Sequence, residues 1–195
     1  DTFLTMTRYS TDTCKTWTTS DSILTIIASN TGNGYHDLIH TNNSKLVLVY
    51  GRNISVNGSP ALRWRNDGDA KGTWTIYGNV DSTDGRWGGA CLVGINKRDV
   101  AIVYPKATTI VMKKWYDSDN TIHQDSKKTI FGTNLNAFTT VLCDCYGIPA
   151  GDSLFVWAQD EQTATNSVGS DSVPDPNNYQ QVPMYKVSTD TGKTF

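Results

Sequence analysis

The sequence predicts an all-β protein built from repeated antiparallel sheets, and three observations support this class. Two near-identical octets lie near the two ends of the chain, at residues 10–17 and 188–195. Between them, short apolar segments end on Tyr50, Tyr104 and Trp157, which are spaced 54 and 53 residues apart. The composition includes 16 Gly, nine Tyr and six Trp, and no stretch has the 3.6-residue periodicity of an amphipathic helix. Together they favour sequential strands and turns.

Each aromatic-ending segment follows another apolar segment, as in an antiparallel hairpin. We expect hairpins of inner strands at residues 37–39 with 46–50, 90–93 with 100–104, and 140–143 with 153–157, with turns such as 41–44 and 96–99. Third strands are expected at residues 61–65, 110–115 and 182–187, and the chain is expected to open on a third strand at residues 3–9.

A repeat of about 50 residues fits the four-stranded blades of a β-propeller. The predicted blade repeats are residues 1–22, 23–78, 79–131 and 132–195. Their strands amount to half a blade, two whole blades and three quarters of a fourth. Since propellers use about four to eight blades, we expect the chain to be a partial propeller, completed by the rest of a longer polypeptide or by another subunit.

The two octets resemble the Asp-box (BNR repeat) of sialidase-like β-propellers. This resemblance implies a turn between the third and fourth strands of a blade, in which the Asp accepts backbone N–H bonds, the Gly position takes a positive φ and the final aromatic packs inward. The matching structural positions are Ser10, Asp12, Trp17, Ser188, Asp190, Gly192 and Phe195, and degraded boxes lie at residues 66–69 and 117–119.

Charge and composition argue against several function classes. The net charge is −2 and the Lys and Arg residues are scattered, so a nucleic-acid partner is not expected. No apolar run approaches the length of about 18 residues that membrane insertion needs. No spacing of Cys and His resembles a zinc site, and neither a metal nor a cofactor is expected.

Of the four cysteines, Cys143 and Cys145 are two apart on a predicted strand and are not expected to bond to each other. Cys91 and Cys143 occupy comparable positions in neighbouring blades. A bridge between those two is conceivable, but buried thiols are the favoured expectation.

Strand direction places the box turns and the first hairpin turns on one face, and the loops before the first strand and after the second on the other. In sialidases the second face holds the active site. The ligand-binding candidates on it are Arg52, Lys106, Gln159, His36, Asp37 and Trp87. Cations and an amide at matched positions suit a carboxylate or a hydroxyl-rich ligand. Each is also explained as a solvated residue beyond a strand end.

Arg52 carries a further resemblance. Residues 34–39 and 46–52 resemble the sialidase blade whose inner strands end in an Arg that binds the substrate carboxylate. That family has Glu-Pro where this chain has His36 and Asp37. The resemblance therefore lies in the spacing between the two inner strands and Arg52, and not in the identity of the residues.

A polar insertion at residues 159–181 interrupts the repeat. A loop of that length is usually functional or disordered. On the predicted ligand face, Asp160 or Glu161 is a candidate general acid and Tyr179 a candidate stacking surface or nucleophile. The alternative is a flexible surface insertion without a catalytic role.

These observations favour a carbohydrate-recognising, sialidase-like propeller segment of a secreted or virion-surface protein, such as an adhesin, with a glycan, for example an acidic sugar, as its partner. The alternative is a sialidase-like exo-glycoside hydrolase. A structural propeller within a larger assembly is a second alternative, because binding, hydrolytic and scaffolding propellers all carry Asp-boxes.

Overall fold

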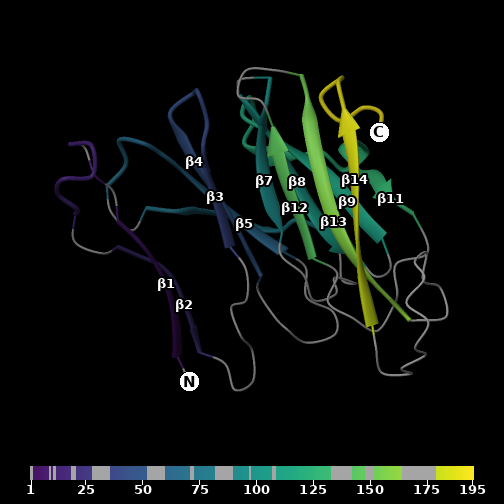
Figure 1. Ribbon diagram of the computed structural model, residues 1–195. Coiled ribbons are helices and arrows are strands. Elements are labelled where there is room, and N and C mark those ends of the chain that lie inside the picture. Colours follow the sequence, from purple (N-terminus) through teal and green to yellow (C-terminus); the bar gives the residue numbers. More distant parts are fainter. Residues whose placement is uncertain are drawn as a thin grey trace.

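The computed structural model describes a protein made of antiparallel β-sheets (Figure 1). The described residues are 2–8, 10, 12–18, 21–27, 36–51, 60–70, 73–81, 90–96, 98–106, 109–132, 142–147, 152–163 and 179–195. Within them the one helical element is the 3₁₀ turn η1 (Gln124–Ser126). No helix in these ranges is long and apolar enough to cross a membrane. The predicted all-β class is confirmed.

The strands form four sheets in sequence order, and each sheet is an antiparallel succession of neighbouring strands. The first sheet contains β1 (Thr2–Thr7) and β2 (Asp21–Ile27). The second contains β3 (His36–His40), β4 (Lys45–Gly51), β5 (Pro60–Asn66) and β6 (Thr75–Asn79). The third contains β7 (Cys91–Ile95), β8 (Asp99–Lys106), β9 (Thr109–Tyr116), β10 (Thr121–Ile122) and β11 (Lys128–Phe131), the last two both pairing with β9. The fourth contains β12 (Leu142–Gly147), β13 (Leu154–Thr163) and β14 (Tyr179–Ser188).

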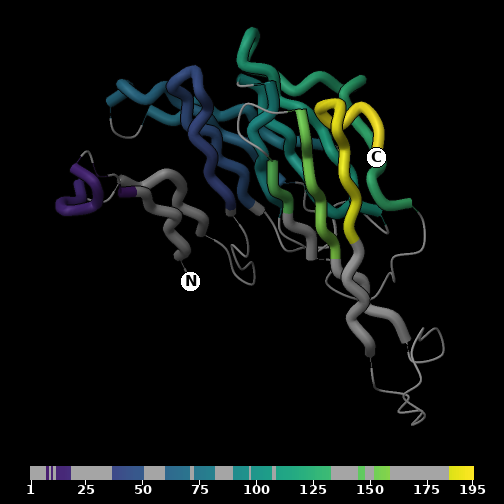
Figure 2. Tube along the Cα trace, turned by 45° about the horizontal axis from the view of Figure 1, so that its top comes forward, coloured from purple at the N-terminus to yellow at the C-terminus, as the bar shows by residue number. Residues whose placement is uncertain are grey.

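The second, third and fourth sheets pack face to face. Figure 2 shows them following one another in the order of the sequence. Because side chains alternate along a strand, β8 serves two interfaces: Ile102 and Tyr104 pack in the core shared with the second sheet, whereas Val103 packs in the core shared with the fourth. The third sheet is therefore apolar on both faces. The first strands of these sheets, β3, β7 and β12, lie at a sheet edge and contact one another in sequence, β3 with β7 and β7 with β12.

The structure keeps the predicted equivalence of Tyr50 and Tyr104 and corrects that of Trp157. Both tyrosines pack on the face of their sheet that is turned away from the following sheet, and Tyr104 therefore faces the second sheet. In β13 it is Ala158, 54 residues after Tyr104, that packs toward the preceding sheet. Trp157 is one residue earlier and therefore belongs to the other face, because a shift of one residue reverses the side-chain direction. The equivalence of Gln159 with Lys106 shifts by the same residue, to Asp160.

The structure also shortens the predicted insertion at residues 159–181. Strand β13 continues to Thr163 and β14 begins at Tyr179, so Asp160 pairs with Val182, Glu161 with Gln181, and Thr163 with Tyr179. The prediction of a loop at these positions was wrong, because a regular antiparallel hairpin continues through polar residues. The rest of the predicted insertion lies outside the described residues.

Candidate functional site

The two octets form turns with the same hydrogen bonds. In the first, Asp12 Oδ1 accepts the Thr16 amide at 2.8 Å and Oδ2 accepts the Thr16 hydroxyl at 2.5 Å. In the second, Asp190 Oδ1 accepts the Thr194 amide at 2.9 Å and Oδ2 accepts the Thr194 hydroxyl at 2.7 Å. Both turns also use a serine, since the Ser10 hydroxyl accepts the Cys14 amide and the Ser188 hydroxyl accepts the Gly192 amide. The predicted capping role of both aspartates is confirmed.

The turns differ in their surroundings. Gly192 has a φ of +78°, and a Cβ there would lie 2.6 Å from Met112 Cε. Cys14, its counterpart, has a φ of 66° and is exposed. Phe195 packs against the core between the third and fourth sheets, as predicted. Trp17 is 55% exposed, so the inward packing predicted for it was wrong. The second turn lies beside the apolar side chains of Met112 and Leu154, whereas the first joins the two strands of the two-stranded sheet, β1 and β2.

Gly192→Ala is expected to lower the free energy of unfolding by about 1–3 kcal/mol, because the new Cβ meets Met112 in a backbone conformation that disfavours side chains. The matched change Cys14→Gly is expected to stay within about 1 kcal/mol of the parent, because the left-handed backbone there suits Gly and the site is exposed. Urea unfolding of both variants measures this difference. Equal effects would show that the second turn is not held by its neighbours.

The hydrogen bonds of the first box turn also lower the pKa of the Asp12 carboxyl group. Bonds from the Thr16 hydroxyl, the Thr16 amide and the Ser10 hydroxyl lower the pKa of Asp12 from 3.8 to about 2. A lowered folded-state pKa means that this carboxylate stabilises the turn fully above pH 3.8 and stops doing so as the pH falls through about 2. In an NMR titration, we expect the Asp12 carboxyl carbon to have its midpoint near 2. A midpoint near 3.8 would contradict the capping geometry.

The degraded boxes lie at the same end of the sheets as the first hairpin turns. The Asp67 amide donates to Ser44 O at 2.8 Å, which joins the β5–β6 turn to the β3–β4 turn. In the third sheet, Asp117 is buried and forms an ion pair with Lys45 Nζ at 2.5 Å. Asp117 therefore joins two sheets. The cap of its own turn is provided by Asp119, whose Oδ1 accepts the Thr121 amide.

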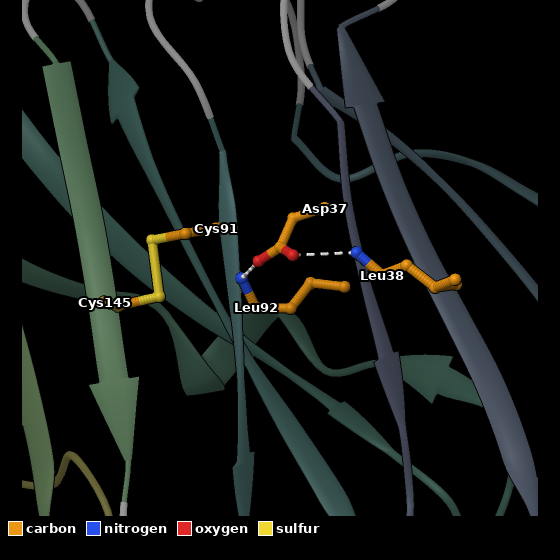
Figure 3. The surroundings of a disulfide bond; sticks show 5 residues. All are labelled: Asp37, Leu38, Cys91, Leu92 and Cys145. Carbon is orange, nitrogen blue, oxygen red and sulfur yellow. Dashed lines mark hydrogen bonds between the residues drawn. A yellow bond between two sulfur atoms is a disulfide. The ribbon is translucent and has the colours of Figure 1, made fainter. Parts of the chain in front are cut away.

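Inner strands of neighbouring sheets are linked through equivalent positions (Figure 3). The Asp37 carboxylate in β3 accepts two backbone hydrogen bonds. One comes from the Leu92 amide of β7 at 2.7 Å, and the other from the adjacent Leu38 amide at 2.8 Å. Cys91 pairs with Val103 in the third sheet as Asp37 pairs with Val49 in the second. Cys91 in turn forms a disulfide with Cys145 of β12, with a Cα–Cα distance of 5.9 Å. The second sheet is thus linked to the third, and the third to the fourth, from the same strand position.

The disulfide corrects the expectation of buried thiols, and the partner of Cys91 is Cys145, whereas the bridge considered from the sequence was with Cys143. Cys145 pairs with Val156, and Cys91 pairs with Val103. Both valines pack in the core between the third and fourth sheets, so the two cysteines face the same interface.

A cluster of charged residues lies at the other end of the sheets, around Asp81 after β6. Its carboxylate is within 2.8 Å of Lys106 Nζ, 3.2 Å of Lys113 Nζ and 3.4 Å of Lys127 Nζ. It also accepts the Tyr104 hydroxyl at 2.9 Å. Lys113 is fully buried, whereas Lys127 is 36% exposed. The arrangement joins the second sheet to the third and places three ammonium groups around one carboxylate.

Burial opposes ionisation of Asp81, but hydrogen bonds from Lys106, Tyr104 and Lys113 outweigh it and hold the pKa of Asp81 well below its usual value. Burial, reinforced by the charge of Asp81, raises the pKa of Tyr104, so its hydroxyl remains a donor. The pKa of Lys127 is lowered by burial and by neighbouring Lys106, against the attraction of Asp81. Among the described residues, three ammonium groups thus surround the Asp81 carboxylate at this end of the third sheet.

The predicted ligand residues do not form one group among the described residues. Lys106 lies in the cluster around Asp81, and Asp37 links β3 to β7. His36 is the first residue of β3, and Gln159 pairs with Leu142 and Pro183 inside the fourth sheet. Arg52 and Trp87 lie outside the described residues.

Asp81, Lys113 and Lys127 were not among the site residues predicted from the sequence. The sequence contained one indication of the buried ion pair, because Lys113 interrupts the apolar strand that runs from Ile110 to Trp115. A lysine in a strand that is buried on both faces requires a carboxylate partner. Among the described residues, no group of three or more His, Cys, Asp and Glu side chains is arranged to hold a metal ion.

Neither a scan against protein-family models nor a search of the curated proteins returns a match for this chain.

Proposed function

We propose that this chain is a segment of a sialidase-like Asp-box β-propeller that recognises glycans at the end of the sheets that carries Lys106. The equivalent box turns, the face-to-face packing of successive antiparallel sheets and the contacts between their first strands support the propeller arrangement. The Cys91–Cys145 disulfide supports an oxidising location, such as a secreted protein or a virion or cell surface.

The observation that carries the glycan proposal is the group of three lysines that the described residues place around Asp81, Lys106, Lys113 and Lys127, of which Lys127 is partly exposed. An exposed ammonium group attracts an acidic sugar, for which it is a charge-assisted hydrogen-bond donor. We therefore favour an acidic glycan as the partner on this face.

Hydrolysis is the alternative. Its candidate carboxylates, Asp160 and Glu161, are adjacent in the sequence, which is weak support for the pair of carboxylates that flanks a glycosidic bond.

A glycan array on the intact protein, with sialylated, uronate-containing and neutral glycans, tests the proposal. Lys127→Ala is expected to weaken acidic-glycan binding about tenfold, equivalent to about 1.4 kcal/mol. Lys128→Ala is the matched control, since Lys128 is the exposed neighbour that pairs in β11 with Met112. Equal binding by parent and Lys127→Ala would reject this surface as the site. Turnover of a fluorogenic sialoside would support the hydrolase alternative.

A further inference from the structure

Three polar side chains meet where the second sheet contacts the third, at the end of the sheets opposite the Asp81 cluster. Lys45 begins β4, and its Nζ forms an ion pair with Asp117 Oδ1 at 2.5 Å and donates to Asn120 Oδ1 at 2.6 Å. Asp117 and Asn120 both lie between β9 and β10. One lysine of the second sheet therefore contacts a carboxylate and a carboxamide of the third.

The ion pair is largely shielded from water. The Lys45 side chain is 12% exposed and that of Asp117 is 3% exposed. Lys45 Nζ also lies 5.1 Å from the ring centre of Trp64 and 5.6 Å from that of Trp115, and Trp115 is fully buried. Burial makes charged groups costly. The neutral amine and carboxylic acid that a proton transfer from Lys45 to Asp117 produces are therefore closer in free energy to the ion pair than they are in water.

Hydrogen bonds hold Asp117 so that one of its oxygens is directed to Lys45. The Asp117 amide donates to Asp99 Oδ1 at 3.1 Å, and Asp117 Oδ2 accepts the side-chain amide of Asn43. Its Oδ1 contacts the amine. A carboxylate next to an amine is the arrangement of a general base and the nucleophile that it activates. The Asn120 carboxamide contacts the same amine, so a nucleophile, a base and an acyl group are in contact, as an intramolecular reaction requires.

From this geometry we propose that Lys45 and Asn120 form an intramolecular isopeptide bond, and that Asp117 is the catalytic base and acid. Asp117 takes a proton from the Lys45 ammonium group, and the neutral Nζ attacks Asn120 Cγ, which is one carbonyl bond of about 1.2 Å beyond the oxygen that it contacts. A bond forms between Nζ and Cγ, and the bond between Cγ and Nδ2 breaks. Asp117 passes the protons released by Nζ to Nδ2, which leaves as an ammonium ion.

Asn120 is the acyl donor and Asp117 is the catalyst for a chemical reason. The negative charge of a carboxylate repels an attacking amine, whereas a carboxamide is neutral and its carbonyl carbon is the better electrophile. The bond joins residues 75 positions apart. It links the second sheet to the third covalently, as the disulfide between Cys91 and Cys145 links the third to the fourth. The proposal does not rest on glycan binding, which concerns the other end of the sheets.

Intact-mass spectrometry of the folded protein, denatured and reduced just before the measurement, tests the proposal. The protein is kept in its folded state until its mass no longer changes. We expect a mass that is lower than that of the sequence by one molecule of ammonia. Proteolysis is expected to release one branched peptide in which Lys45 is joined to Asn120. A folded protein that keeps the full mass of its sequence would overturn the proposal.

Lys45→Arg, Asp117→Asn and Asn120→Ala are each expected to keep the full mass of their sequences. Lys45→Arg retains a cation beside Asp117, and circular dichroism verifies that each variant is folded. Asp119→Asn is the matched control, because Asp119 is an acid of the same turn that pairs with His123 and is about half exposed. It is expected to lose ammonia as the parent does.

Two further results would contradict the assigned roles. A branched peptide that joins Lys45 to Asp117, with loss of water, would make Asp117 the acyl donor. Loss of ammonia without a branched peptide would place the reaction at another side chain. Formation of the bond in a folded Asp117→Asn variant at the rate of the parent would show that the carboxylate is not the catalyst.

Discussion

Asp81→Asn is expected to lower the free energy of unfolding by about 3–5 kcal/mol, the range for removing one partner of a buried ion pair. The substitution leaves Lys113, which is fully buried, without its counter-charge, and Lys106 loses an ion pair at 2.8 Å. The pKa of Asp81 is lowered on folding. Its stabilising contribution is therefore complete above pH 3.8 and is lost as the pH falls through the folded-state value.

Urea unfolding at pH 7 measures this loss, and Asp119→Asn is the control. Asp119 forms an ion pair with His123 at 2.7 Å, but both side chains are about half exposed, so its loss is expected to be at most about 1 kcal/mol. Similar losses for both substitutions would show that the Asp81 cluster is solvated and does not hold the second and third sheets together. A double variant, Asp81→Asn with Lys113→Met, is expected to recover part of the stability, because the uncompensated buried charge is removed.

Removing the disulfide by replacing both Cys91 and Cys145 with Ala is the second large expected effect. The two residues are 54 positions apart in sequence. A cross-link that closes a loop of this size stabilises a protein by about 4 kcal/mol through the lost entropy of the unfolded chain. We expect a loss of that order in the free energy of unfolding of the oxidised protein.

Cys14→Ser is the control for this double substitution, since Cys14 is a free, exposed cysteine. It is expected to change stability by less than about 0.5 kcal/mol. Calorimetric unfolding with and without a reductant gives an independent measurement, because the reductant is expected to destabilise the parent and leave the double variant unchanged. A parent that is insensitive to the reductant would contradict the presence of the bond.

The local chemistry of the turns made much of the fold predictable. An Asp followed four residues later by a Thr determines the hydrogen bonds of each box turn within one octet, so the roles of Asp12 and Asp190 could be predicted without knowing any other part of the chain. The hairpins were predictable for the same reason, since alternation and turn residues act over a few positions.

Contacts between sheets were much less predictable. The face on which Trp157 lies depends on a register that one residue reverses, and the spacing of 53 residues concealed that shift. The pairing of Cys91 with Cys145, and not with Cys143 of the same strand, depends on how far β12 is displaced along β7. Asp81 and Lys113 are 32 positions apart in the sequence and in different sheets. Their ion pair therefore follows from the packing of whole sheets. Of the candidate site, only Lys106 was identified in advance.

Crystallography or electron cryomicroscopy of the intact protein with a bound acidic glycan tests the central claim most directly. The account predicts sheets that follow one another around a common axis, with β3, β7 and β12 innermost, both Asp-box turns on one face, and bound acidic glycan on the face of Lys106 and Lys127. A sandwich of two sheets in which β3, β7 and β12 do not converge on an axis, or an acidic glycan bound away from Lys127, would contradict it.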